Sequence, residues 1–264
     1  MSLRAAFIYI DKLLTGGRLL RRWVVFRVNR LIRHRVCTIN YGYSVQYQQS
    51  RKNPLNILFE KYGSDKGGLA TSTHHFAWPC HNYADFYHMA FGLRRREVRL
   101  VIECGIGTNN PELVSTMGSS GKPGASLRAW RDYFPGARII GCDIDDNILF
   151  SEDRISTYQC DQTSIVSIKQ FQSNARIRNN EVDLIIDDGL HEFEAGKCFF
   201  ENMIGLLGED GLYVIEDVTH VDIVKYKDYF SEKGSTYDAA YIYLTTPQRN
   251  IGGDNNIIVI RKTL

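Results

Sequence analysis

Short apolar runs alternate with amphipathic segments from residue 100 to the end of the chain. The apolar runs, several of which end in Gly or Asp, predict buried strands at 100–105, 138–143, 155–159, 182–186, 212–215, 240–244 and 256–260. Segments with helical spacing separate most of them, at 126–134, 165–174, 193–207 and 222–230. Strands that alternate with helices predict an α/β fold with a doubly wound, Rossmann-like, mostly parallel sheet of seven strands. The close spacing of the last two strands predicts an antiparallel pair at its end.

The N-terminal region has a different pattern. Residues 55–68 and 81–96 are expected to be helical, whereas residues 3–35 mix apolar residues with arginines. In the second half of that segment Leu20, Trp23 and Leu31 recur at helical spacing between arginines, which predicts a basic amphipathic helix. We therefore divide the chain into a basic N-terminal helical arm, 1–54, and an α/β domain, 55–264.

The charge of the chain is strongly asymmetric. The 264 residues carry a formal net charge of +2, but residues 1–52 carry +10 and residues 53–264 carry −8. Through residues 1–35 the arm could contact an anionic membrane surface, or it could pack on the body or on another subunit, which would fit a homo-oligomer. The arm lacks the aromatic interleaving and the motifs of nucleic-acid binding, so no nucleic-acid partner is expected.

Composition excludes several classes of protein. No run approaches ~18 uninterrupted apolar residues, which argues against a multi-span membrane protein. The six cysteines form no CxxC pair, and Cys104 and Cys142 fall in apolar runs, which predicts buried thiols in a reducing compartment. Charges interrupt every apolar stretch near the N-terminus, so no signal peptide is expected. These features predict a cytoplasmic protein, peripheral on the inner face of the membrane if the arm binds lipid.

A glycine turn follows the first predicted strand. In the segment 103–107, ECGIG, Gly105 and Gly107 would let the backbone approach a ligand closely. A dinucleotide-binding fingerprint needs a third glycine near Asn110 or Pro111, and none is present. The shorter ExGxG form, which includes Glu103, fits S-adenosylmethionine (SAM), which has no pyrophosphate.

Acidic residues follow the next two strands. Asp143 ends the second strand, where a carboxylate can accept the ribose hydroxyls of an adenosine ligand. It lies 40 residues beyond Glu103, roughly twice the usual ~20, because residues 109–125 form an inserted loop. Asp161 and Gln162 follow the third strand and could face the adenine amino group.

The densest cluster of chemical groups follows the fourth and fifth strands. The fourth ends in Asp187 and Asp188, with His191 three residues later, and the fifth ends in Glu216 and Asp217. Because ligands of open α/β sheets bind at the carboxyl ends of the strands, these side chains should share one rim. Four carboxylates there repel one another unless a cation neutralises them, and oxygen ligands favour Mg²⁺ or Mn²⁺. A histidine beside them suits general-base catalysis.

Together these segments resemble a known family, the metal-dependent class I SAM-dependent sugar O-methyltransferases related to the macrocin and mycinamicin enzymes. The resemblance covers about residues 55–264, and its most specific part is the pair DDGxH and IED, 28 residues apart from Asp188 to Glu216. The motifs that carry it are SDKG (64–67), HNY (81–83), IECGIG (102–107), GASLRAWRDYFPGARIIGCDID (124–145), CDQTS (160–164), IIDDGLHEF (185–193), YVIED (213–217) and GGDNNIIVI (252–260).

The resemblance implies SAM- and Mg²⁺-dependent methylation of a sugar hydroxyl, in a glycan such as a bacterial polysaccharide or in an antibiotic glycoside. It implies metal ligands at Asp188, Glu216 and Asp217, with His191 as the general base. The SAM pocket is expected to include Glu103, Gly105, Gly107, Ser126, Asp143, Asp161 and Asp187. Two alternatives stay open at this point: an NAD-dependent oxidoreductase on the same fold, and a non-catalytic SAM-fold scaffold in glycan assembly.

Overall fold

The computed structural model describes residues 53–67, 78, 80–234, 236–244 and 254–263. Residues 1–52 of the predicted basic arm lie outside these described residues, so the arm and its boundary at residue 54 stay predictions. Among the helices that are described, none is long and apolar enough to cross a membrane.

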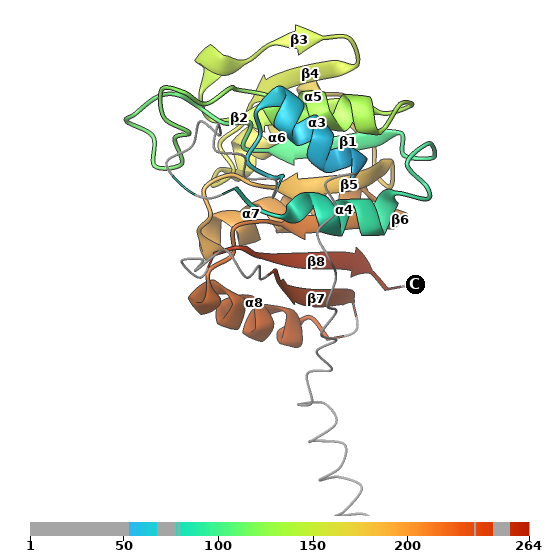
Figure 1. The fold of residues 1–264 in the computed structure, drawn as a ribbon. Helices are drawn as coiled ribbons and strands as arrows, with labels where there is room; N and C mark the ends of the chain where they lie inside the picture. The colour runs from blue at the N-terminus through green and yellow to red at the C-terminus, as the bar shows by residue number, and fades with distance from the viewer. Residues whose placement is uncertain (1–52, 68–77, 79, 235, 245–253, 264) are drawn as a thin grey trace, which may run out of the picture. The chain divides into compact units, whose positions relative to one another are not determined.

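One sheet forms the centre of the described structure (Figure 1), with the strand order β3-β4-β2-β1-β5-β6-β8-β7. The strands are β1 (Leu100–Cys104), β2 (Arg138–Asp143), β3 (Ser151–Glu152), β4 (Ile155–Gln159), β5 (Val182–Asp187), β6 (Leu207–Ile215), β7 (Tyr237–Tyr243) and β8 (Asn256–Lys262). Strands β4, β2, β1, β5 and β6 pair in parallel, and β8 is antiparallel to both β6 and β7. The doubly wound α/β sheet and its final antiparallel pair are therefore confirmed.

The sheet has one strand more than predicted. Strand β3 contributes only two exposed residues, which pair antiparallel with β4 and have no apolar pattern from which to predict them. Strand β6 begins at Leu207, five residues before the predicted start, because exposed Glu209 and Asp210 and a register shift against β5 interrupt its apolar pattern.

Helices cover both faces of the sheet, as expected for a doubly wound fold (Figure 1). The helices are α3 (Pro54–Tyr62), α4 (Tyr83–Phe91), α5 (Ala125–Tyr133), α6 (Ile165–Asn174), α7 (Phe193–Met203) and α8 (His220–Glu232). Side chains of α3, α4 and α5 share one hydrophobic core with one face of the sheet, and those of α6, α7 and α8 share a second core with the other face. In β1, Val101 belongs to the first core and Ile102 to the second, which is why neighbouring residues of this strand are both apolar.

Backbone hydrogen bonds align the carboxyl ends of four neighbouring strands, β2, β1, β5 and β6. The amide of Gly105 donates to Cys142 (2.8 Å), that of Asp188 to Cys104 (2.9 Å) and that of Glu216 to Asp187 (2.9 Å). From β1 the chain winds to β2 and β4 on one side and later to β5 and β6 on the other. The ends of β1 and β5 therefore form the switch point at which open α/β sheets bind ligands.

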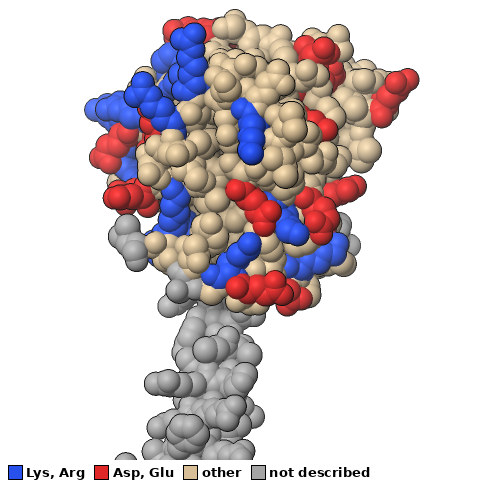
Figure 2. All heavy atoms as spheres, turned by 180° about the vertical axis from the view of Figure 1, so that it is seen from behind, with Lys and Arg blue, Asp and Glu red and all other residues tan. Residues whose placement is uncertain are grey.

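Charged side chains of both signs are scattered over the surface of the described unit. On the face shown in Figure 2, Lys and Arg side chains are interspersed with Asp and Glu. Pairs such as Lys233 with Glu201 (3.4 Å) and Lys225 with Asp222 (2.8 Å) are partly exposed and contribute little stability. The strong positive charge of the sequence thus belongs to residues 1–52.

Candidate active site

A cavity of about 450 Å³ opens at the carboxyl ends of β1, β2, β5 and β6. Its volume is in the range of small-molecule sites. Seven of the predicted site residues are on its wall: Gly105, Gly107, Ser126, Asp143, Asp188, His191 and Asp217. Residues 114–117 and Lys122 also line it, so the inserted loop between β1 and α5 forms part of the wall.

The backbone geometry of the turn after β1 requires glycine at two positions. Gly105 has a φ of +81°, and a Cβ there would lie 2.0 Å from the carbonyl oxygen of Asp188. Gly107 has a φ of +86°, and its Cβ would lie 2.0 Å from the sulfur of Met117. Only glycine combines the left-handed backbone with these close approaches. The turn can therefore pass directly beneath a ligand in the cavity.

Asp143 is held at the cavity wall by backbone amides. Its carboxylate accepts hydrogen bonds from the amides of Ile106 (2.9 Å) and Asp145 (3.1 Å). Burial raises the pKa of Asp143 above its ordinary value, although these amide hydrogen bonds act in the opposite direction. The side chain is thus oriented from β2 toward the glycine turn, where the sequence predicted a ribose-binding acid.

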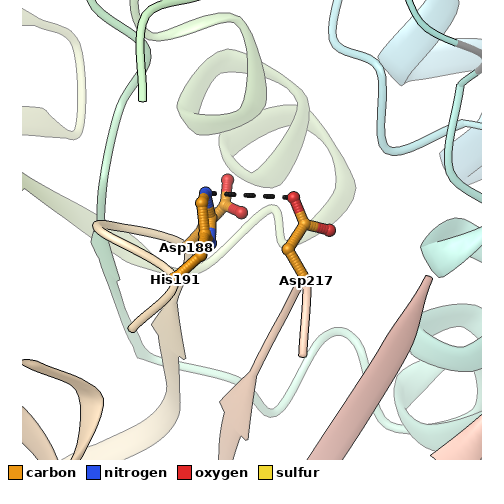
Figure 3. Close-up of side chains that lie close together, drawn as sticks. All are labelled: Asp188, His191 and Asp217. Atoms are coloured by element: carbon orange, nitrogen blue, oxygen red, sulfur yellow. Dashed lines mark ion pairs between the residues drawn. The ribbon is translucent and has the colours of Figure 1, made fainter. Parts of the chain in front are cut away.

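Asp188, His191 and Asp217 converge at the end of the cavity next to β5 and β6 (Figure 3). One potential ligand atom from each lies within 4.8 Å of the other two, and His191 Nε2 is 3.9 Å from Asp217 Oδ2. His191 and Asp217 both have positive φ values, 59° and 53°, which are uncommon for residues with a side chain. Such conformations occur disproportionately at functional sites.

Side chains from the N-terminal segment hold Asp217. The Tyr83 hydroxyl donates a hydrogen bond to Oδ1 of Asp217, and His81 Nδ1 lies 3.4 Å from the same oxygen. Burial acts to raise the pKa of Asp217, but His81, His191 and the Tyr83 hydroxyl outweigh it and hold the pKa below its usual value. Asp217 is therefore an anion fixed in place, with Oδ2 directed toward His191.

Glu216 lies behind this cluster and does not reach the cavity wall. Its carboxylate accepts a hydrogen bond from the Tyr87 hydroxyl (2.5 Å), and the Lys66 ammonium pairs with its other oxygen. Lys66 also lies 2.5 Å from Asp188 Oδ2 and 3.4 Å from Glu103 Oε1. The predicted ligand Glu216 thus sits in a buried layer, with both oxygens occupied by protein groups.

Three other predicted cofactor residues lie off the wall of the large cavity. Glu103 is fully buried, accepts a hydrogen bond from the Trp130 indole (2.8 Å), and has a pKa that burial raises to about 7. Asp187 is buried beside Gln162, which donates to it (3.1 Å), and borders a separate cavity of about 10 Å³. Asp161 accepts hydrogen bonds from the amide and hydroxyl of Thr163, in the turn before α6. Their roles toward a cofactor stay predictions, because none of the three side chains lines the large cavity.

Four residues that contact the site had no role assigned from the sequence, and three of them belong to two of its motifs. Lys66 belongs to SDKG, and His81 and Tyr83 belong to HNY, whereas Tyr87 follows one helical turn later. These motifs carried part of the resemblance, but no role was assigned to their residues. Their contacts join positions 122 to 150 residues apart, so only the tertiary structure shows them.

The donor set fits a divalent cation. Asp188 and Asp217 offer hard carboxylate oxygens at the cavity wall, and such oxygens suit Mg²⁺ or Mn²⁺. Burial, and then the neighbouring carboxylates of Glu216 and Asp217, push the pKa of Asp188 well above its usual value despite Lys66. A cation between Asp188 and Asp217 would offset this excess of negative charge.

These features define a SAM-methyltransferase fold with a polar cavity at the switch point of its sheet. The MycE methyltransferase from the mycinamycin biosynthetic pathway, solved with Mg and SAH, superimposes with a TM-score of 0.55 and 25% identity. The match covers 81% of this chain and 55% of that chain. The predicted fold class is thereby confirmed.

Sequence comparison gives particular relatives. The chain is 31% identical over 175 residues to 8-demethyl-8-(2-methoxy-alpha-L-rhamnosyl)-tetracenomycin-C 3'-O-methyltransferase of Streptomyces olivaceus, which covers 66% of this chain and 39% of that protein. It is also 31% identical over 170 residues to mycinamicin VI 2''-O-methyltransferase of Micromonospora griseorubida. This match covers 64% of this chain and 37% of that protein. The chain thus matches about two fifths of the length of these curated relatives. No protein-family profile matches it. The predicted resemblance to sugar O-methyltransferases is confirmed.

Proposed function

We propose that this protein transfers a methyl group from SAM to a sugar hydroxyl of a glycosylated small molecule, with a divalent cation at the acceptor end of the cavity. One observation carries the proposal. A single cavity has the glycine turn and Asp143 on its wall together with Asp188, His191 and Asp217. The first set suits the adenosine and methionine parts of SAM, and the second suits a hydroxyl that must lose its proton.

The protein's own residues would chiefly align the two substrates. Asp143 would accept the ribose hydroxyls of SAM, and Ser126 and the turn at Gly105 would border its methionine part. His191 would take the proton of the acceptor hydroxyl as its oxygen attacks the methyl carbon. SAM is a sulfonium and needs no activation, so positioning would supply most of the catalysis.

Asp188 and Asp217 are the residues that we expect to hold Mg²⁺ or Mn²⁺. When bound, such a cation supplies positive charge that favours the deprotonated form of a nearby hydroxyl. Glu216 remains a predicted ligand, but to ligate a metal it would have to share its oxygens with Lys66 and Tyr87 or release them. The protein would keep the cation beside His191, which would receive the proton.

The names of the relatives support a sugar attached to an antibiotic-like aglycone as the acceptor. Two of them act on rhamnosyl groups of tetracenomycin C, and another is a demethylmacrocin O-methyltransferase of Streptomyces fradiae. They favour a glycosylated natural product over a polysaccharide. The relatives named above are O-methyltransferases, which disfavours an oxidoreductase, and the intact cluster of Asp188, His191 and Asp217 disfavours a non-catalytic scaffold.

Calorimetric titration with SAM tests the donor half of the proposal. We expect micromolar binding, weakened about 10- to 100-fold by Asp143→Asn, because a hydrogen bond to a charged group contributes about 1.5–3 kcal/mol. Asp146→Asn, at an exposed position three residues later, is the matched control and should bind as the wild type does. Absence of SAM binding by the wild-type protein would rule out the proposal.

We further propose that residues 1–35 attach the protein to the inner surface of an anionic membrane. The +10 charge of residues 1–52 and the apolar spacing around Trp23 support this proposal. The full chain should co-sediment with vesicles rich in phosphatidylserine and be released by salt, whereas neutral vesicles should leave it in solution. Equal sedimentation with neutral and anionic vesicles would contradict a charge-based contact. Packing of the arm on a second subunit would then be the favoured interpretation.

A further inference from the structure

Lys66 is a buried cation shared by three strand ends. Its side chain is 3% exposed, and its ammonium pairs with Glu103 near the end of β1, Asp188 after β5 and Glu216 after β6. Glu103 and Glu216 are themselves fully buried. Lys66 comes from the segment that follows α3, so a residue outside the central sheet reaches into the carboxylate rim.

The charges around this ammonium are unbalanced. Four carboxylates, those of Glu103, Asp188, Glu216 and Asp217, lie around Lys66, His81 and His191. Removing one partner of a buried ion pair leaves an uncompensated charge, which costs far more than an exposed pair contributes. Without the ammonium, Asp188 and Glu216 would repel each other and Glu103 would face them unpaired. Lys66 is therefore the charge on which the geometry of the rim depends before any metal arrives.

We propose that Lys66 is a positioning residue that acts as a built-in counter-ion: it assembles the rim carboxylates in the absence of metal and competes with the divalent cation for Asp188. The metal part of this inference rests on the proposed function. Two consequences follow. The metal-free protein should keep its rim intact, and loss of the ammonium should make the carboxylates both less stable and more attractive to an added cation.

Thermal melting in EDTA tests the counter-ion role without activity, SAM or metal. Lys66→Met is expected to lower the melting temperature by about 10 °C, because a buried ion-pair network is broken. Adding Glu103→Gln to Lys66→Met should recover a large part of this loss, since one unpaired carboxylate is removed while the amide oxygen can still accept from Trp130. Lys61→Met, at an exposed lysine of α3 paired with Asp132, is the matched control and should melt within about 2 °C of wild type.

Titration with Mn²⁺ tests the competition. Lys66→Met should bind Mn²⁺ about tenfold more tightly than wild type, because a neighbouring positive charge has been removed. A lysine that only fills space would leave the affinity unchanged. The inference would be overturned if Lys66→Met melted at the wild-type temperature in EDTA, or if Glu103→Gln gave no recovery. Unchanged or weaker Mn²⁺ binding by Lys66→Met would overturn it as well. If the wild-type protein binds no Mn²⁺, the metal in the proposed function fails, whereas the EDTA melts still decide whether Lys66 is the counter-ion.

Discussion

Asp188→Asn is expected to lower the rate of methyl transfer by about 1,000-fold. The substitution keeps the size of the side chain but removes the carboxylate that reaches the cavity wall between Lys66 and His191. Loss of a metal-holding charge removes several kcal/mol of transition-state stabilisation, at about 1.4 kcal/mol for each factor of ten. The rate is measured as release of S-adenosylhomocysteine at saturating SAM, and Mn²⁺ affinity should fall in parallel.

Asp146→Asn serves as the control for this variant. Asp146 is exposed and lies in the short turn after β2, away from the cavity wall, so its rate and Mn²⁺ affinity should match those of wild type. SAM binding should survive in Asp188→Asn, because Asp143 and the glycine turn are unchanged. An Asp188→Asn protein that folds, binds SAM and turns over within threefold of wild type would contradict the assigned role of this carboxylate.

His191→Ala is expected to lower the rate by about 100- to 10,000-fold, the range typical of a lost general base. His191 lies at the cavity wall with Nε2 3.9 Å from Asp217, close to where the acceptor hydroxyl would bind. Its loss removes the proton acceptor but none of the proposed metal carboxylates. Steady-state kinetics should therefore show a fall in kcat with SAM affinity and Mn²⁺ affinity nearly unchanged.

His220→Ala is the matched control. His220 is the first residue of α8, is exposed and stacks on Tyr243, so its removal should leave turnover intact. If His191→Ala instead lost Mn²⁺ binding along with activity, His191 would be a metal ligand and the base would have to be sought elsewhere. Equal turnover by His191→Ala and wild type would remove His191 from the chemistry altogether.

The fold could be predicted because buried parallel strands carry short, mainly apolar runs. β1 and β5 are enclosed by helices on both faces, so most of their residues are apolar, and the acids Glu103 and Asp187 fall at or next to the carboxyl ends of these strands. The same reasoning misplaced the start of β6, where exposed Glu209 and Asp210 break the pattern within a strand. Chain topology, rather than composition, then placed Asp188 and Asp217 at one rim.

The orientation of individual carboxylates could not be predicted. Glu103 and Glu216 lie at the same rim as Asp188 and Asp217, but the structure turns both of them into a buried layer. That difference comes from Lys66, Tyr87 and Trp130, which reach the rim from other parts of the chain. Local sequence contains no signal for such contacts.

The function that we propose for this cavity is the transfer of methyl groups from SAM to a sugar hydroxyl with the help of a divalent cation. The most direct measurement follows transfer of labelled methyl from SAM to a panel of rhamnosylated aromatic polyketides and macrolide glycosides, each paired with its aglycone. We expect label on at least one glycoside, none on its aglycone, and loss of transfer in EDTA that Mg²⁺ restores. Equal labelling of aglycone and glycoside, or full transfer in EDTA, would contradict the claim.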